Sequence, residues 1–380
     1  MKRVCFFHVG PIADFHGYSI DSLDPAPYFP QWDSSTLFER LSEAKSMDDL
    51  YRHRDRAYMR FVGDFVDKFK DYDLVVLANY NPIHPEVLAL QLARPVKVMG
   101  FVDDPFSTYI RGVPYLWAFD GAFHISPSYS PQLSMAEALK LWGCEHVYWW
   151  PLVWPNSLEP GGRLWPHLAG LEQFHQRGDA FFTERDLDVI YVGGGYSTKM
   201  DRLASLKKKF GPRMQIYGRW SYQGYVGMLR WLTGKPPMWS KVSPISNEQR
   251  RSLYFRTRIG LNMHLSGQPA ETGNMRMYEV PAHGMMQLCD QAAQDAQEQI
   301  FADGKEAVYY HSTDDAIAKI EYYLAHAEER IAIARAGFER VHRDYDGEAG
   351  FKKLLDWAAS LPRKTGHRPL PAASQFLNAR

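Results

Sequence analysis

The chain has 380 residues, a length that favours two domains of ordinary size over a single core. Its 44 basic and 44 acidic residues give a formal net charge of zero, so no global field draws it to nucleic acid or to an anionic membrane. The three cysteines, Cys5, Cys144 and Cys289, lie singly in apolar stretches without the spacing of a zinc site. We therefore expect buried thiols, a reducing compartment and no nucleic-acid partner.

The first apolar segment, VCFFHVG at residues 4–10, stops within a few residues. It is too short for the core of a signal peptide and far too short to span a bilayer. The sequence thus predicts a cytoplasmic protein with no integral membrane segment.

Strands and helices alternate through the first part of the chain. Apolar runs predict strands over residues 3–10, 73–78, 96–102, 121–125 and 147–150. Apolar residues at helical spacing predict helices over residues 47–70, 85–93 and 131–142. Strands that are apolar on both faces are typical of a parallel sheet covered on both sides by helices.

The alternation breaks among prolines and glycines after residue 151 and restarts at residue 186. The second part contains predicted strands over residues 186–192, 215–218, 259–263 and 284–289. Its predicted helices cover residues 199–209, 247–254, 314–325, 328–341 and 350–359. The predicted fold class is α/β, with two Rossmann-like doubly wound domains over residues 1–165 and 186–345, a linker over 166–185, and a last helix and tail over 346–380.

Ligands of such sheets bind beyond the carboxyl ends of the strands, so the loops there are the first places to search. Gly193, Gly194 and Gly195 follow a predicted strand and precede a predicted helix. Their backbone amides and the helix N-terminus suit a phosphate, although a tight turn that needs glycine explains them equally well.

A second candidate is the short helix predicted in NMRMYEVPAHGMMQLCD, residues 274–290. If Asn274 caps this helix, Arg276 and Glu279 stand one turn apart on one face. A surface ion pair between them, worth little, is the simpler alternative. The helix is short and follows a glycine-bearing loop, and these two features instead favour a role in which its first turn contacts a ligand. Glu271 lies eight positions before Glu279.

Three blocks resemble a known family: VIYVGGG, RMYEVPAHGMMQLCD and IFADGKEAVYYHSTDD, within about residues 186–345. They are similar to the C-terminal half of glycosyltransferases of the GT-B fold, specifically the spore-maturation CgeB-like group. GFVDDPFSTY and GCEHVYWWPLVW carry a looser resemblance in the first half. The resemblance implies two domains facing across a cleft, a C-terminal nucleotide-sugar domain, an N-terminal acceptor-side domain, and a last helix that crosses back to the first domain.

The resemblance also implies roles for residues of the second domain. Glu279 would accept hydrogen bonds from the ribose hydroxyls, and Arg276 would bind the diphosphate. The glycine turn and Arg219 would frame the nucleotide, and Glu271 matches a carboxylate that reaches the donor sugar in related enzymes. Lys199 is a further candidate cation, and both it and Arg219 equally suit surface positions.

The chemistry requires stabilisation of the negative charge that develops on the leaving diphosphate, and a base or phosphate oxygen that takes the acceptor proton. Asp103 and Asp104, after a strand of the first domain, are the first choices for that base, although Asp-Asp-Pro also commonly ends a strand. His264 and His124 are secondary choices, each more simply explained as a hydrogen-bonded structural histidine. No metal or cofactor is implied, because the nucleotide sugar is a substrate.

The sequence therefore predicts a metal-independent glycosyltransferase that moves a sugar from a nucleotide-sugar donor to a glycan, lipid, protein or small molecule. A nucleotide-sugar epimerase on the same scaffold and a non-catalytic sugar-nucleotide- or glycan-binding protein stay open as alternatives. The donor base, the donor sugar, the stereochemical outcome and the oligomeric state are left open by the sequence.

Overall fold

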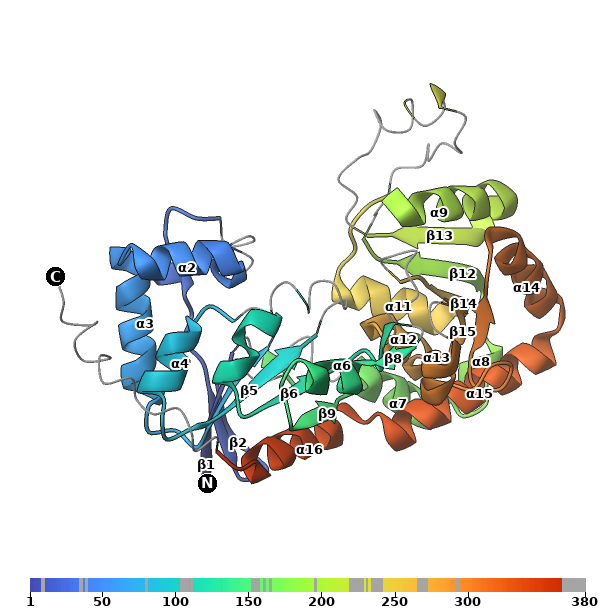
Figure 1. Cartoon of the computed structure of the whole chain (residues 1–380). Coiled ribbons are helices and arrows are strands. Elements are labelled where there is room, and N and C mark those ends of the chain that lie inside the picture. Colours follow the sequence, from blue (N-terminus) through green and yellow to red (C-terminus); the bar gives the residue numbers. More distant parts are fainter. Residues whose placement is uncertain are drawn as a thin grey trace. The chain divides into compact units, whose positions relative to one another are not determined.

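The chain divides into two compact units in a computed structural model, drawn in Figure 1. Unit 1 consists of Met1–Trp150, Leu158–Gly162 and Glu348–Arg380, and unit 2 of Pro151–Ser157 and Arg163–Gly347. The structure describes residues 1–7, 11–33, 37, 40–78, 81–102, 109, 112–130, 132–151, 158–159, 162–163, 166–194, 197–218, 229, 232–233, 242–264, 273–291 and 294–363. No helix in these ranges is both long enough and apolar enough to cross a membrane.

Unit 1 contains a seven-stranded sheet in the order β2-β3-β1-β4-β5-β6-β9. The strands are β1 Lys2–Phe6, β2 Ile12–Phe15, β3 Tyr18–Asp21, β4 Leu74–Ala78, β5 Val96–Phe101, β6 Gly121–His124 and β9 Val147–Trp149. All neighbours are parallel except β2 and β3. The five predicted strands are confirmed, whereas the β2–β3 hairpin was not predicted because its short strands lack a long apolar run.

Six helices of unit 1 lie before residue 150 in the described ranges: η1 Ala26–Tyr28, α2 Ala44–Arg52, α3 Arg56–Phe69, α4 Pro85–Gln91, η2 Val113–Ala118 and α6 Met135–Leu141. The single helix predicted over residues 47–70 is wrong, because two helices occupy this range. Arg54 has a left-handed φ of 56°, which ends α2, and the Asp55 side chain then caps α3 by accepting from the Tyr58 amide.

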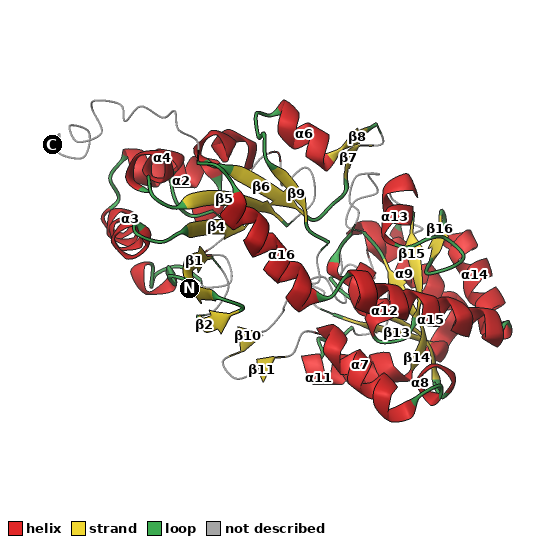
Figure 2. Cartoon of the chain, turned by 90° about the horizontal axis from the view of Figure 1, so that it is seen from below, coloured by secondary structure: helices red, strands yellow, loops and turns green. Residues whose placement is uncertain are grey.

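The last helix, α16 Gly347–Ser360, packs on the sheet of unit 1. The Phe351 and Phe6 rings lie 5.2 Å apart in an edge-to-face contact, and the Trp357 ring stacks on Tyr148 at 5.1 Å. Figure 2 shows α16 against the strands of this sheet. The final helix therefore returns to the first unit, as the resemblance implied.

Unit 2 contains a five-stranded, fully parallel sheet in the order β13-β12-β14-β15-β16. The strands are β12 Leu187–Val192, β13 Met214–Tyr217, β14 Thr257–Asn262, β15 Met286–Asp290 and β16 Val308–Tyr310. The four predicted strands are confirmed, and β16 was not predicted because it is only three residues long. The strand order reverses between β12 and β14, which is where doubly wound sheets bind their ligands.

The helices described in unit 2 are α7 Pro166–Arg177, α8 Ala180–Thr183, α9 Ser197–Phe210, η3 Gly211–Arg213, α11 Asn247–Arg256, α12 Met275–Ala282, α13 Gln294–Ile300, α14 Thr313–Ala325 and α15 Ala327–Asp344. Two small two-stranded sheets complete the described elements: β7 Ser128–Ser130 with β8 Leu133–Ser134, and β10 Leu158–Glu159 with β11 Gly162–Arg163.

Residues 166–185 are not the linker that the sequence predicted, because α7 and α8 lie there and belong to unit 2. Phe174, Phe181 and Phe182 each contact the Phe338 ring of α15, at centroid distances of 5.4, 5.4 and 5.5 Å. These aromatic side chains are part of the unit 2 core. One proline and two glycines interrupt the apolar periodicity of this stretch, so its helices were not predicted, but its aromatic residues explain why it packs.

Candidate functional site

The candidate site lies at the carboxyl edge of the unit 2 sheet, where its parallel strands end. β12 runs into Gly193 and Gly194, β13 into Gly218, and β14 into Met263 and His264. β12 and β14 are neighbours, with Ile190 opposite Gly260. The switch point therefore brings the glycine turn and the end of β14 together at this edge.

The helix α12 begins at this edge and is capped as predicted. The Asn274 side chain accepts a hydrogen bond from the Met277 amide at 3.2 Å, and its amide nitrogen lies 3.4 Å from the Met263 carbonyl oxygen. The cap thus ties the first turn of α12 to the end of β14. Arg276 and Glu279 follow in the first two turns.

Arg276 lies on the glycine turn. Its Nη1 donates to the Val192 carbonyl at 2.9 Å, and its guanidinium lies 5.6 Å from the centre of the Tyr191 ring. A Cβ atom on Gly193 would lie 2.6 Å from that Nη1 and 2.7 Å from the Tyr191 hydroxyl. Glycine at position 193 therefore leaves the space that the arginine occupies, which brings two predicted site residues together.

The turns after β12 and β13 lie against each other. The Gly193 amide donates to the Tyr217 carbonyl at 2.9 Å. Gly218 has a φ of 146°, and a Cβ atom there would lie 1.9 Å from the Gly193 carbonyl oxygen. Only glycine fits at position 218, so the close contact between the two turns requires this residue.

Lys199, in the first turn of α9, reaches across the switch point. Only 4% of the residue is exposed, and its Nζ donates to the Met263 carbonyl at 2.8 Å. The alternative that Lys199 is an ordinary surface charge is therefore wrong. Its ammonium group and the Asn274 amide approach the same carbonyl oxygen at the end of β14.

Glu279 is buried, with 8% of the residue exposed. Its Oε1 forms an ion pair at 3.0 Å with Nη2 of Arg250 in α11. Burial raises the pKa of Glu279, while the charges of Arg250, Arg276 and Arg251 act in the opposite direction. The exposed surface pair considered from the sequence therefore does not describe this carboxylate.

Five predicted site residues lie outside the described residues: Asp103, Asp104, Gly195, Arg219 and Glu271. Their proposed roles stay predictions. The residues that the structure does bring to one edge are Gly193, Lys199, Asn274, Arg276 and, in the second turn of α12, Glu279.

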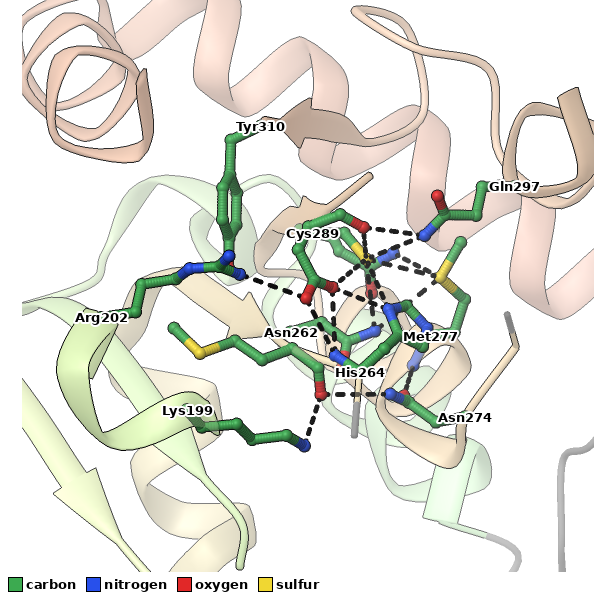
Figure 3. A network of polar contacts seen from close by, with 12 residues as sticks. Lys199, Arg202, Asn262, His264, Asn274, Met277, Cys289, Gln297 and Tyr310 are labelled. Carbon is green, nitrogen blue, oxygen red and sulfur yellow. Dashed lines mark hydrogen bonds and ion pairs between the residues drawn. The ribbon is translucent and has the colours of Figure 1, made fainter. Parts of the chain in front are cut away.

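Sequence reasoning missed a polar network at the ends of β14 and β15 (Figure 3). The backbone amide of His264 lies 3.1 Å from both carboxylate oxygens of Asp290, and His264 Nδ1 lies 2.7 Å from Oδ1. Arg202 of α9 forms an ion pair with Asp290 at 3.3 Å and lies over the Tyr310 ring. His264 was named from the sequence only as a secondary candidate. The sequence carried one signal for this pair: His264 follows one buried strand, and Asp290 ends the next.

Asp290 is ionised in this network. Burial alone would raise the pKa of Asp290, but the contacts with the His264 imidazole and backbone amide, together with the charge of Arg202, outweigh it and hold the pKa below its ordinary value. The carboxylate therefore acts as an acceptor for the imidazole and as a counter-charge for the arginine.

The atoms His264 Nδ1, Cys289 Sγ and one Asp290 carboxylate oxygen all lie within 4.8 Å of one another. The imidazole and the carboxylate, however, are at hydrogen-bond distance, and the thiol donates to the Asp290 carbonyl at 3.4 Å. Arg202 adds a positive charge beside the same carboxylate. This arrangement suits a hydrogen-bonded group better than a cation site.

A buried arginine holds the far end of α12. Arg185 is 5% exposed, and its guanidinium donates to four carbonyl groups: Phe181 at 3.0 Å, Tyr254 at 2.9 Å, Thr257 at 2.6 Å and His283 at 2.7 Å. These carbonyls lie at or near the C-terminal ends of α8, α11 and α12, where a cation is favourable. Arg185 therefore fixes the helix that carries Arg276 and Glu279, although burial lowers the pKa of the guanidinium to about 9.

In unit 1, His124 is the last residue of β6, at the carboxyl edge of that sheet. It is 1% exposed, and its Nδ1 lies 2.7 Å from the Ser126 carbonyl oxygen, to which only an N–H group can bond. Burial lowers the pKa of His124 to about 4. The imidazole is therefore neutral at pH 7, and its Nε2 carries a lone pair.

Comparison with known proteins supports the fold. A family model described as glycosyl transferase-like matches residues 200–356. HepE of Anabaena in complex with UDP is similar in structure, with a TM-score of 0.53 and 13% identity over 95% of this chain and 100% of that chain. No curated protein matches the chain.

Two further solved structures are similar at the same level. The α,α-trehalose 6-phosphate synthase of Burkholderia multivorans has a TM-score of 0.53 and 12% identity, over 99% of this chain and 91% of that chain. The N-terminal domain of Candida albicans trehalose-6-phosphate phosphatase has a TM-score of 0.53 and 10% identity, over 94% and 90%. The chain therefore has a glycosyltransferase-like GT-B fold built from two Rossmann-like units.

Proposed function

We propose that the chain is a glycosyltransferase and that the carboxyl edge of unit 2 binds its nucleotide-sugar donor. The observation that carries this proposal is the convergence of two cations, Lys199 and Arg276, with the glycine turn at the switch point. A diphosphate is the part of a nucleotide sugar that such a cationic edge suits. HepE, which shares the fold, is described in complexes with UDP and with UDP-glucose.

The reaction breaks the bond between the anomeric carbon of the sugar and the diphosphate oxygen, and it forms a bond from that carbon to an acceptor hydroxyl oxygen. The proton of that hydroxyl goes to a base or to the leaving phosphate. Negative charge develops on the diphosphate as the bond breaks. In this proposal Arg276 and Lys199 stabilise that charge through hydrogen bonds already oriented by the fold.

Glu279 is proposed to bind the ribose. A carboxylate accepts from two neighbouring hydroxyls at once, which matches a ribose diol. Arg250 forms an ion pair with Glu279 in the described structure, so the ribose would supply donors to a carboxylate that is already partly compensated. Glu271 and Arg219 stay proposed contacts of the donor sugar and of the nucleotide.

The narrower proposals concern the acceptor side and the cell compartment. Asp104, with Asp103 as second choice, is proposed as the base, and the acceptor is a hydroxyl compound bound through unit 1. We further propose a CgeB-like enzyme that uses neither a metal ion nor a cofactor. The three buried free cysteines support a reducing, cytoplasmic setting.

The test is calorimetric titration of UDP, GDP, dTDP, CDP, CMP and ADP into the wild type, the Arg276→Met variant and the Arg256→Met variant. Arg256 is a matched control, because it forms an exposed ion pair with Asp186 at the opposite end of β12. We expect one nucleotide to bind the wild type and the control equally, and Arg276→Met about tenfold to a hundredfold more weakly. Absence of binding by every nucleotide would contradict the proposal.

Product analysis then separates transfer from the other reactions of a nucleotide sugar. Wild-type protein is incubated with the sugar conjugate of the nucleotide that binds, without an acceptor. Slow release of free nucleoside diphosphate supports a transferase, whereas an epimerised donor indicates an epimerase. Binding without either product indicates a non-catalytic protein.

A further inference from the structure

The strongest group outside the proposed diphosphate contacts is the pair formed by His264 and Asp290. His264 directly follows Met263, whose carbonyl oxygen accepts from Lys199. Figure 3 shows Lys199 of α9, His264 after β14 and Asn274 of α12 close together. The pair therefore lies next to the position proposed for the diphosphate.

The hydrogen bonds of His264 determine which ring nitrogen carries the proton. Its Nδ1 lies 2.7 Å from Oδ1 of the ionised Asp290, so Nδ1 is the donor. The backbone amide of His264 bonds to the same carboxylate, and Arg202 forms an ion pair with it. In the neutral imidazole the lone pair consequently lies on Nε2, on the far side of the ring from Asp290.

This Nε2 has no hydrogen-bond partner among the residues that the structure describes. The side chain of His264 is fully buried, with 0% exposed. A buried acceptor without a donor costs free energy, which a bound group with a hydroxyl would recover.

We propose that His264 Nε2 accepts a hydrogen bond from a hydroxyl of the transferred sugar, and that Asp290 positions the imidazole for this contact. The inference rests on the proposed function. Among the parts of a nucleotide sugar, the diphosphate offers only acceptors at neutral pH, and the ribose hydroxyls are assigned to Glu279. The remaining donors are the sugar hydroxyls and the N–H groups of the base, and of these the transferred sugar is bonded directly to the diphosphate, next to which His264 lies. His264 therefore acts as a residue that selects the donor sugar.

The test compares UDP with UDP-glucose, and GDP with GDP-mannose, by calorimetric titration. His264→Asn keeps an N–H group near the position of Nδ1 but has no atom at the position of Nε2. His264→Gln extends further and can return an acceptor there. For each protein the measured quantity is the ratio of the dissociation constants with and without the sugar.

We expect His264→Asn to raise this ratio about fivefold to tenfold in favour of the free nucleotide, with the affinity for UDP or GDP changed less than about twofold. His264→Gln should recover part of the change. Asp290→Asn should move the ratio in the same direction as His264→Asn, because a neutral amide no longer holds the proton on Nδ1. Melting curves without ligand check that each variant is folded.

The outcomes separate this inference from the function on which it rests. An unchanged ratio in folded His264→Asn, with nucleotide still bound, overturns the inference and leaves the proposed function standing. Equal loss of affinity for nucleotide and nucleotide sugar also overturns it, because the dyad then only supports the site. If the wild type binds none of the six nucleotides titrated above, the proposed function fails and the inference fails with it; if it binds one other than UDP or GDP, that nucleotide and its sugar conjugate form the pair compared.

Discussion

Both units are built around a largely parallel sheet, but the side chains described at the ends of their strands differ in charge. At the carboxyl edge of unit 2, Lys199 and Arg276 bond to backbone carbonyls at the ends of β14 and β12. At the described strand end of β6 in unit 1, His124 is neutral and bonds to the Ser126 carbonyl. The first edge carries cations, which suit an anion, whereas the described side chain at the end of β6 is uncharged at neutral pH.

The difference shows that a doubly wound sheet provides a place for a ligand, while the side chains at the strand ends determine which ligand fits. In unit 2 the cations are fixed by a helix cap, by glycines and by a buried arginine. In unit 1 the imidazole is fixed by one carbonyl. Substitutions of these supporting residues should change stability or binding, from the largest expected effect to the smallest.

The largest expected effect is on Arg185, which supports the unit 2 edge from the C-terminal end of α12. Arg185→Met removes the guanidinium donor from four carbonyl groups inside the core. We expect the free energy of unfolding to fall by about 3–5 kcal/mol. Urea denaturation measures this, with Arg256→Met as the control, for which less than about 1 kcal/mol is expected. Similar losses in both variants would contradict the role given to Arg185.

The second prediction compares the buried histidines of the two units during acidification. Burial lowers the pKa of His124 in unit 1 to about 4 and of His283 in unit 2 to about 3, from an ordinary value of 6.5. Both imidazoles are neutral in the folded chain but take up protons in the unfolded chain below pH 6.5. The unfolded state then binds more protons, so the free energy of unfolding falls as the pH decreases from about 6.5 to about 4.

For each histidine the expected loss over that range is on the order of 3 kcal/mol. Scanning calorimetry from pH 7 to pH 4 measures the combined effect. His124→Gln and His283→Gln should each make the melting temperature less dependent on pH. A pH dependence that neither variant reduces would show that other groups cause it.

The third prediction concerns Glu279, a buried carboxylate that we expect to lower the stability of the fold while it contributes to nucleotide binding. Burial raises the pKa of Glu279, so the folded chain holds its proton more strongly than the unfolded chain, and stability is lost as the pH rises through the folded pKa. We expect Glu279→Gln to melt at a higher temperature than the wild type at neutral pH. The same variant should bind the nucleotide about tenfold more weakly. Unchanged affinity would remove Glu279 from the ribose site.

The smallest expected effect on folding comes from Gly193. In Gly193→Ala the new methyl group would lie 2.6 Å from Nη1 of Arg276, so the end of the arginine side chain must move. We expect about a tenfold loss of nucleotide affinity with little change in melting temperature. Gly63→Ala in α3 is the control, because its methyl group meets nothing within 4 Å and should stabilise unit 1 slightly. Unchanged nucleotide affinity in Gly193→Ala would contradict a role of this turn in positioning Arg276 for the nucleotide.

Local patterns were enough to predict much of this fold and part of the site. Long apolar strands, the glycine turn at Gly193 and the cap at Asn274 depend on neighbouring residues, so the sequence carries them directly. The strand β16 and the helix α8 are too short for a period, and tertiary packing of Phe181 and Phe182 determines where that segment lies.

The missed part of the site depends on residues that are distant in the sequence. Asp290 contacts His264 across 26 positions and Arg202 across 88 positions, and neither spacing has a local signature. The burial of Glu279 beside Arg250 likewise follows from packing of α11 near α12. Such pairs become visible only when the parallel strands are placed side by side.

Hydrogen exchange measured with and without bound nucleotide tests most directly whether the unit 2 edge is the donor site. The account predicts slower exchange, in the presence of nucleotide, for the backbone amides of residues 187–194, 257–264 and 274–282. The same amides should be protected much less in Arg276→Met at a nucleotide concentration close to the dissociation constant of the wild type. Protection confined to strands β4, β5 and β6 of unit 1, with residues 187–194 and 274–282 unchanged, would contradict the account.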